Sequence, residues 1–399
     1  MKRYIIIFLL ILLLTGCKFY DEYEMPEEVS IELNDNLFEV YSEGITIKDL
    51  ISDSNVEITN ENKKLETNEI GDYEIEVEYK YKKRNYKYIV DYEIVDTEKP
   101  FLMRYSSYRS PLVNEEINFC EGLSYIDNYD REPTCSVAGE YDLTIPGRYY
   151  LKYQIKDQSD NIAEKDITFD VFEEWPSSNY DDSDDDYEYT YTLFDDIQEK
   201  YKNQDVMLGI DVSVWQGDID FNKVKEDGAE FVIMRMAYSG GIDDPIGLDR
   251  KFEQNIKNAK DAGLKVGVYI YTSASSKEEA ISQAKFIRKH LNKTKLDFPI
   301  AYDFEEWSTF NDLKMSSHDL LERVNEYQSI LEKDGYDMMI YGSKWYLENA
   351  WFPNKYDTWL AHYTDETDYK GDYILWQLCS DGIIDGINGY VDFDIYYKK

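Results

Sequence analysis

The sequence contains few residues of the kinds that usually build metal sites. Among its 399 residues there are only three histidines, His290, His318 and His362, and no two of them have H-x-x-x-H spacing. The four cysteines are too scattered along the chain to form a zinc cluster. We therefore expect no metal site built from histidine or cysteine ligands, and we assign no metal and no other cofactor.

Positive charge is also scarce. Asp and Glu outnumber Lys and Arg by 82 to 43, which gives a net charge of −39. A surface this acidic repels phosphate backbones, so a nucleic-acid-binding role is not expected. Hydrophobic residues still make up 43% of the chain and aromatic residues 16%, which is typical of a folded protein. The length predicts about two to four domains.

The amino terminus has the composition of a secretory signal. Residues 1–3 are Met-Lys-Arg, and the apolar run from Ile5 to Leu14 is too short for a stable membrane-spanning helix. The sequence Leu14-Thr-Gly-Cys17 resembles the bacterial lipobox, in which the cysteine is acylated and becomes the first mature residue. This resemblance implies a lipoprotein signal peptide over residues 1–17 and a lipid anchor at Cys17, on the extracellular face of the cell membrane in the cell envelope. An ordinary signal peptide with an incidental cysteine is the alternative.

Two segments, 28–96 and 97–173, consist of short runs in which apolar and polar residues alternate, as in β-strands. They align with each other, with Gly71 at the position of Gly147. The sequence from Pro146 to Asn161 resembles the closing hairpin of bacterial immunoglobulin-like surface domains. The resemblance implies two small all-β immunoglobulin-like sandwiches that act as spacers, with weak adhesive modules as the alternative.

The second of these segments also contains two of the four cysteines. Cys120 and Cys135 lie in the same predicted domain and are candidates for a disulfide in an extracellular protein. Cys379 lies in an apolar strand pattern and is expected to be a buried small hydrophobic residue.

Residues 174–206 interrupt the strand pattern. The run from Ser177 to Asp186 is dominated by aspartate and serine and cannot bury a core. A calcium-binding loop has ligands at fixed spacing, a central glycine and a closing glutamate, and this run lacks that pattern. We therefore interpret 174–206 as a solvated acidic linker.

From residue 207 to 399, predicted strands and helices alternate. Eight strands with helices mostly between them favour an α/β fold of the (β/α)8 type, an irregular TIM barrel. The last three strands leave no room for full helices between them. The predicted strands are 208–212, 231–237, 265–272, the strand that begins at Phe298, 338–341, 358–361, 373–378 and 391–395.

Acidic residues lie at the ends of these strands, where such a barrel has its active site. Asp211 ends the first strand, and Asp303 and Glu305 follow the fourth on the same face, since side chains alternate along a strand. Asp392 lies on the last strand, which a closed barrel places beside the first. A protonated and an ionised carboxyl group side by side are what glycoside cleavage requires. In so acidic a chain, however, an Asp-x-Glu triplet also arises by chance.

Aromatic residues gather at the same strand ends and together form a plausible sugar-binding platform. Singly, each of them is more typical of core packing than of a ligand contact. They are Tyr269, Tyr271, Tyr302, Tyr341, Trp359, Tyr363 and Trp376, and all but Tyr302 are candidate substrate-binding residues.

The ordered motifs of this region resemble glycoside hydrolase family 25, the N,O-diacetylmuramidase-type lysozymes. They are Gly209-Ile-Asp211-Val-Ser213-Val-Trp215-Gln216-Gly217, Tyr302-Asp303-Phe-Glu305, Tyr341-Gly342, Trp359-Leu-Ala361-His-Tyr363, Trp376-Gln377 and Gly389-Tyr-Val-Asp392.

The family resemblance implies a lysozyme that hydrolyses the β-1,4 bond between N-acetylmuramic acid and N-acetylglucosamine in the glycan strands of peptidoglycan. Glu305 would be the general acid and Asp303 its carboxylate partner. Asp211 and Asp392 would be the supporting acids of the cleft. Position 270 is Ile, where several members of the family carry His, so a substrate contact at that position is not implied.

Three alternatives remain open from the sequence. The first is a catalytically inactive, lipid-anchored protein that binds cell-surface glycans. The second is a glycosidase for chitin-like or host glycans, but the D-x-x-D-x-D-x-E run of chitinase-type barrels is absent before Glu305. The third is a metal-dependent deacetylase or peptidase, which the scarcity of histidine disfavours. The sequence identifies no protein partner.

Overall fold

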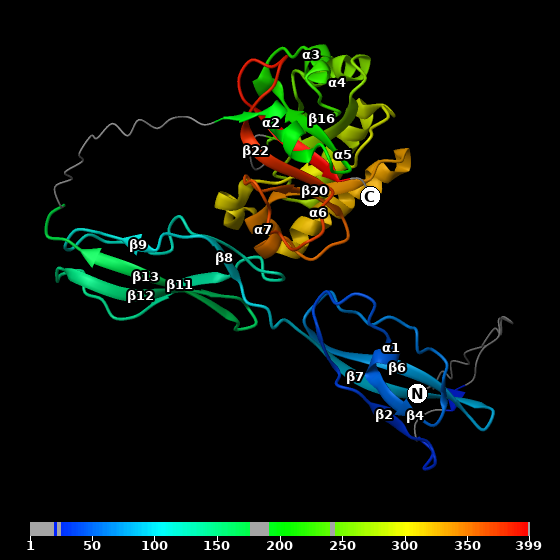
Figure 1. Cartoon of the computed structure of the whole chain (residues 1–399). Coiled ribbons are helices and arrows are strands. Elements are labelled where there is room, and N and C mark those ends of the chain that lie inside the picture. The colour runs from blue at the N-terminus through cyan, green and yellow to red at the C-terminus, as the bar shows by residue number, and fades with distance from the viewer. Residues whose placement is uncertain (1–19, 22–24, 176–190, 240–243, 398–399) are drawn as a thin grey trace, which may run out of the picture. The chain divides into compact units, whose positions relative to one another are not determined.

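A computed structural model describes residues 20–21, 25–175, 191–239 and 244–397 (Figure 1). The predicted signal peptide, the predicted acylation site Cys17 and the acidic centre of the predicted linker lie outside these residues. The chain divides into two compact units, Met1–Thr97 and Glu98–Lys399, which are described separately. Among the helices of the described residues, none combines the length and the apolar character needed to cross a bilayer.

The first unit is built around one long antiparallel hairpin, β6–β7. Alternate side chains of this hairpin are buried, among them Val77, Tyr79, Val90 and Ile94, so the predicted period-two pattern forms the core of the unit. Its elements are β1 (Tyr20–Asp21), β2 (Ile31–Leu33), β3 (Leu37–Glu39), α1 (Ile47–Leu50), β4 (Ile51–Ser54), β5 (Glu57–Ile58), β6 (Gly71–Tyr81) and β7 (Arg84–Val95).

The second unit begins with another β domain, whose long hairpin β12–β13 corresponds to β6–β7 (Figure 1). Gly147 begins β12 as Gly71 begins β6, as the internal alignment predicts. β11 and β9 flank this hairpin, while β8 and β10 form a separate two-stranded ribbon. The strands are β8 (Phe101–Arg104), β9 (Tyr108–Arg109), β10 (Ser124–Ile126), β11 (Thr134–Ala138), β12 (Gly147–Lys156) and β13 (Ile162–Val171).

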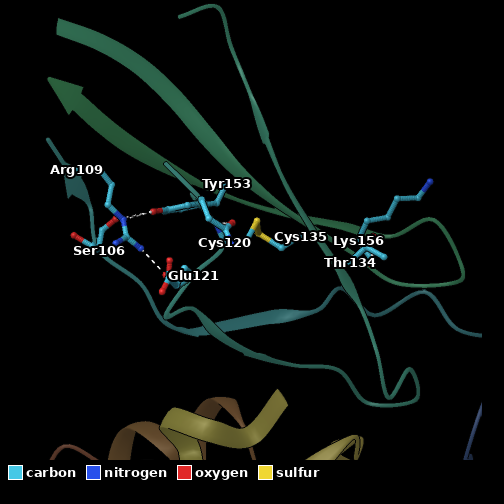
Figure 2. The surroundings of a disulfide bond; sticks show 9 residues. Ser106, Arg109, Cys120, Glu121, Thr134, Cys135, Tyr153 and Lys156 are labelled. Atoms are coloured by element: carbon cyan, nitrogen blue, oxygen red, sulfur yellow. Dashed lines mark hydrogen bonds between the residues drawn. A yellow bond between two sulfur atoms is a disulfide. The ribbon is translucent and has the colours of Figure 1, made fainter. Parts of the chain in front are cut away.

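Cys120 and Cys135 are joined in a disulfide within this β domain (Figure 2). Cys135 lies on β11, and Cys120 lies in the connection that precedes β10. Beside the bond, the Arg109 guanidinium donates a hydrogen bond to the carbonyl of Glu121 at 2.8 Å. The disulfide therefore fixes a long connection to the edge of the sheet. Cys379 is buried with a free thiol, as expected.

The remainder of the second unit is a closed barrel of eight strands. Seven strands are parallel, but the last is antiparallel to both the first and the seventh, which it joins. The barrel therefore departs from the all-parallel arrangement that the (β/α)8 prediction implied. The strands are β15 (Val206–Val212), β16 (Phe231–Tyr238), β18 (Lys265–Tyr271), β19 (Ile300–Asp303), β20 (Met338–Ser343), β21 (Asp357–Ala361), β22 (Leu375–Ile383) and β23 (Val391–Tyr397).

Helices connect the earlier strands, and capping residues begin the two longest. The Ser276 hydroxyl accepts a hydrogen bond from the Glu279 N–H at 3.2 Å, and Ser316 and Asp319 form a capping box. Residues 362–374 and 384–390, all described, contain no helix, as the short connections predicted. The remaining elements are η1 (Val214–Gln216), α3 (Phe221–Glu226), β17 (Gly247–Leu248), α4 (Phe252–Asp261), α5 (Lys277–Leu291), η2 (Glu306–Leu313), α6 (Ser317–Leu331), η3 (Glu332–Asp334) and α7 (Lys344–Asn349).

The predicted linker extends too far along the chain. β14 (Thr192–Leu193) pairs with β22, and α2 (Phe194–Tyr201) follows it directly. Phe194, Ile197 and Tyr201 of this helix are buried in the barrel core. Their i, i+3, i+7 spacing is the apolar stripe of an amphipathic helix, which the surrounding acidic residues concealed in the sequence.

The β8–β10 ribbon packs against η2 of the barrel. Ser124 donates a hydrogen bond to the carbonyl of Trp307, and the Tyr125 N–H donates to Asn311 Oδ1 at 3.2 Å. Met103 and Ile126 of the ribbon are buried in the hydrophobic core of the barrel. Contacts of this kind join the β domain directly to the barrel.

A paired arginine and carboxylate reinforce this interface. The Arg131 guanidinium donates to both carboxylate oxygens of Asp319, at 2.6 and 2.9 Å. Lys314 of the barrel pairs with Glu132 of the β domain at 2.8 Å. The Arg131–Asp319 geometry is bidentate and the Asp319 carboxylate is buried, whereas the Arg131 side chain is largely exposed, so the pair adds a geometrically specific contact to the interface.

Removing the disulfide should destabilise the β domain of the second unit. The bond closes a loop with a sequence separation of 15 residues, for which chain-entropy arguments give about 3 kcal/mol. We expect a Cys120→Ser, Cys135→Ser double variant to unfold at a lower urea concentration than the wild type, as followed by circular dichroism. The wild type in reducing agent should match the variant, and equal midpoints for oxidised wild type and variant would contradict the expectation.

Candidate active site

Four acidic side chains meet at one end of the barrel. Asp211 near the end of β15 lies directly opposite Asp392 in the strand register, as expected for neighbouring first and last strands. Since β23 runs antiparallel, its first residues reach the same end as the last residues of β15. Asp303 ends β19, and Glu305 follows two residues later with its side chain on the same side. All four line a single cavity of about 380 Å³.

Most of the predicted aromatic residues line this inner cavity as well. Tyr363 lies at its rim and is 56% exposed, whereas Trp359 is buried and its indole N–H donates to Asp394 Oδ1 at 2.8 Å. The inner cavity is lined by Asp211, Trp215, Arg235, Tyr269, Tyr271, Asp303, Glu305, Tyr341, Trp359, Tyr363, Gln377 and Asp392.

Trp376 is the exception among the predicted substrate-binding residues. It is buried in the outer core of the barrel, and its indole N–H donates to the carbonyl of His362 at 2.8 Å. Side chains alternate along β22, so Leu375 and Gln377 point to the inside of the barrel and Trp376 to the outside. The assignment of Trp376 to a sugar site is therefore corrected. Tyr302 likewise points outward and packs against Tyr327.

Gln377 takes the place that was expected of Trp376. Its amide nitrogen donates to Asp211 Oδ2 at 2.7 Å, and its amide oxygen accepts from the hydroxyls of Tyr341 and Tyr363, both at 2.9 Å. One side chain thus connects an acid to two aromatic residues of the cavity. The sequence motif Trp376-Gln377 included this residue, but the motif alone did not indicate which of the two faces inward.

Arg235 is a second cavity residue that the sequence analysis missed. It lies on β16, is nearly buried and pairs with Asp249 at 2.9 Å. Asp249 also accepts a hydrogen bond from the backbone N–H of Val214, at the turn after β15. The sequence did indicate Arg235, because it is a charged residue within the apolar strand Phe231–Tyr238. Arginine is rarely buried without a partner or a function.

Burial raises the pKa of the carboxyl groups in this cavity. The pKa of Asp303 is well above its usual range because of burial and the nearby charge of Glu305, and Arg235 only partly opposes this effect. The pKa of Asp211 is raised by burial and by the charges of Asp392 and Asp394. The pKa of Asp392 is raised to about 6, chiefly by burial. The cavity therefore holds protons at a pH where exposed carboxyl groups are ionised.

Glu305 lies where this acidic cavity opens to solvent. Desolvation by the surrounding protein atoms raises its pKa, and the charge of neighbouring Glu306 raises it further. A carboxyl group that stays protonated near neutral pH and can still reach a ligand has the properties of a general acid. Asp303, two residues earlier, has one buried oxygen, Oδ1, that accepts no hydrogen bond from any residue that the structure describes.

A second, larger cavity of about 790 Å³ continues from the first, and the two share Glu305, Tyr341 and Tyr363. Together they form a groove across the barrel end, with Glu305 near its centre. The outer cavity is lined by Arg104, Phe304, Glu305, Trp307, Ser308, Tyr341, Gly342, Ser343, Lys344, Trp345, Tyr346, Ala361, His362 and Tyr363. All of these residues belong to the barrel except Arg104, which belongs to β8.

A barrel with paired carboxyl groups and aromatic residues in an open groove defines a glycoside hydrolase. The sequence model described as "Glycosyl hydrolases family 25" matches residues 210–387. Over 193 residues the chain is 33% identical to "Uncharacterized protein YegX" of Escherichia coli strain K12, covering 47% of this chain and 68% of that protein. The chain belongs to glycosyl hydrolase family 25 and is an enzyme of the lysozyme type.

Two other similar proteins are matched over smaller shares of their own length. The chain is 29% identical over 195 residues to the "Autolytic lysozyme" of Clostridium acetobutylicum, covering 47% of this chain and 55% of that protein. Among solved structures, the modular autolysin LytC from Streptococcus pneumoniae in complex with a synthetic peptidoglycan ligand aligns at 24% identity and a TM-score of 0.43. That alignment covers 62% of this chain and 56% of LytC.

The pH profile of the enzyme should depend on Glu306. Its charge is one of the two causes that raise the pKa of Glu305. The variant Glu306→Gln lowers the pKa of Glu305, so the acid loses its proton at lower pH and the basic limb of kcat/KM moves toward lower pH. An Asp312→Asn variant, which removes an exposed charge from the same segment, should leave the limb in place. A basic limb that stays in place or moves to higher pH in the Glu306→Gln variant would contradict this role of Glu306.

Proposed function

We propose that this enzyme is a muramidase. It hydrolyses the β-1,4 bond between N-acetylmuramic acid and N-acetylglucosamine in peptidoglycan, with Glu305 as general acid. The proposal is carried by the position of Glu305, a carboxyl group of raised pKa at the centre of a groove, beside Asp303. Membership of family 25 and the similarity to an autolytic lysozyme support the choice of substrate.

In the proposed reaction, Glu305 protonates the glycosidic oxygen as the bond to the leaving N-acetylglucosamine breaks. The acetamido oxygen of the N-acetylmuramic acid unit attacks the anomeric carbon and forms a cyclic oxazolinium intermediate. Water then attacks the same carbon, and this attack opens the ring. The water gives a proton to Glu305, which is thereby restored as the acid. Two displacements at one carbon retain the configuration.

Asp303 orients the acetamido group in this scheme. Its buried Oδ1 has no hydrogen-bond donor among the described residues, and an unsatisfied buried oxygen is costly. The acetamido N–H of the substrate supplies the missing donor and is thereby held with its oxygen toward the anomeric carbon. The raised pKa of Asp303 falls when a donor and a developing positive charge arrive beside it, so the group becomes a stabilising carboxylate during the reaction.

Asp211 and Asp392 support this arrangement from the opposite wall. Gln377 holds Asp211 in place through its 2.7 Å hydrogen bond, and the pKa of Asp392, about 6, lets that group exchange its proton near neutral pH. Tyr269, Tyr271, Tyr341, Trp359 and Tyr363 form the walls against which sugar rings pack. Trp215, which is 81% exposed at the rim, extends this surface.

The proposed activity can be tested by muropeptide release from purified peptidoglycan with the full-length chain in mild detergent. We expect products with reducing-end muramic acid and retained configuration by NMR. Glu305→Gln should lower release by about a hundredfold to ten-thousandfold, the usual contribution of a general acid. Glu332→Gln, which changes an exposed glutamate in η3, should release muropeptides at the wild-type rate. Binding of peptidoglycan by the wild type without any release would instead favour the glycan-binding alternative.

We also propose that acylated Cys17 tethers the enzyme to the outer face of the cell membrane. The proposal is supported by the lipobox-like sequence Leu14-Thr-Gly-Cys17. A Cys17→Ala variant should no longer incorporate labelled fatty acid. It should accumulate as an uncleaved precursor that migrates more slowly on a gel, because a chain without the acylated cysteine cannot be processed at this position. Labelled fatty acid retained by the variant would refute the tether. A Cys379→Ala variant is the matched control.

A further inference from the structure

The β domain of the second unit contributes one side chain to the substrate groove. Arg104 is the last residue of β8, beside Ser124 of β10 in the strand register. Ser124 is hydrogen-bonded to the carbonyl of Trp307, two residues after Glu305. The ribbon is thus fixed to the segment that carries the proposed general acid, and Arg104 lines the outer cavity together with Glu305.

The surrounding contacts hold the ribbon in this position. Phe101, at the start of β8, packs its ring against Trp345 of the outer cavity at 5.2 Å between centroids. Met103 is buried in the barrel core, and the bidentate Arg131–Asp319 pair lies on the same interface. The pairing of β8 with β10 is irregular at this end of the ribbon, and Arg104, unlike its buried neighbours Leu102 and Met103, is exposed and lines the outer cavity.

Arg104 is a cation that has no ionic partner among the residues that the structure describes. Its side chain makes no hydrogen bond or ion pair with any residue within the described ranges. Lys344, the other cation of the outer cavity, is already paired with Glu348 and Asp368, at 3.2 and 3.3 Å. In a chain of net charge −39, an arginine left unpaired in a groove is available to an anion from outside.

The charge of the groove indicates what that anion is. The inner cavity is lined by four carboxyl groups, and its one cation, Arg235, is already paired with Asp249, whereas the outer cavity presents the Arg104 guanidinium. The glycan backbone of peptidoglycan is uncharged, and its negative charges are the carboxylates of the peptides attached to muramic acid. A guanidinium binds carboxylates through two parallel hydrogen bonds.

We propose that Arg104 binds a carboxylate of the stem peptide, so that the β domain selects peptide-bearing glycan strands. This inference rests on the proposed function, because it assumes that peptidoglycan occupies the groove. The sugar to which the peptide is attached then lies between the inner cavity and Arg104. The β domain therefore acts as one wall of the substrate site.

Binding measurements test this assignment independently of catalysis. Calorimetry would use full-length chains carrying Glu305→Gln, so that the ligand is not cleaved, with soluble, uncross-linked peptidoglycan strands. One sample keeps its peptide carboxylates, and the other has them converted chemically to amides. We expect Arg104→Gln to weaken binding of the carboxylate-bearing strands about tenfold, the effect of losing one charge-assisted contact. Binding of the amidated strands should not change.

Further variants separate a specific contact from a general effect of charge. Arg104→Lys should restore part of the affinity, because an ammonium keeps the charge but loses the bidentate geometry. Lys152→Gln removes one positive charge from the exposed face of β12 in the same domain and should have no effect. The loss of affinity caused by Arg104→Gln should also become smaller as the salt concentration rises, because salt screens the charge of the guanidinium.

Two results would overturn the assignment. One is equal affinity of the Arg104→Gln chain and its parent for carboxylate-bearing strands. The other is an equal loss on both kinds of strand, which would mean that Arg104 acts without regard to the carboxylate. Failure of the proposed function looks different: chains with intact Glu305 release no reducing ends, whatever residue stands at position 104.

Discussion

The active site depends on the pairing of β15 with β23, which closes the barrel. This antiparallel contact places Asp211 directly opposite Asp392, although the two residues are far apart in the sequence. Had the last strand entered the barrel in the parallel direction, the beginning of β23 would lie at the far end, away from Glu305. Closure by one reversed strand is therefore what brings acids from both ends of the domain into one cavity.

The cost of burying so many carboxyl groups is met by protons and by a few neutral donors. Asp394 is buried among Asp211 and Asp392 and keeps the indole N–H of Trp359 as a donor. Arg235 is the cation of the inner cavity, but it is already shared with Asp249. These neutral donors, and one cation that is already paired, compensate the carboxylate charges only in part. The pKa values of the buried carboxyl groups are therefore raised. The same surroundings that make the cluster costly keep its carboxyl groups protonated at a pH where exposed carboxyl groups are ionised.

The docking of the second β domain extends this logic beyond the barrel. η2 follows Glu305 directly and contacts the β8–β10 ribbon along its length. This segment thus packs into the barrel core and is also hydrogen-bonded to the ribbon. This arrangement joins the β domain to the barrel through a hydrogen-bonded interface as well as through the linker, and it places Arg104 at the outer cavity.

Much of the barrel followed from the sequence by itself. Strand alternation placed Asp303 and Glu305 on one side, and the short connections between the last three strands predicted that no full helices lie there. Patterns of this kind report local periodicity, which depends on neighbours along the chain. The direction of β23, the inward face of β22 and the approach of Arg104 to Glu305 were decided only by tertiary structure. Each depends on strand register or on packing between distant segments, and a period of two is the same for a strand read in either direction or from either face.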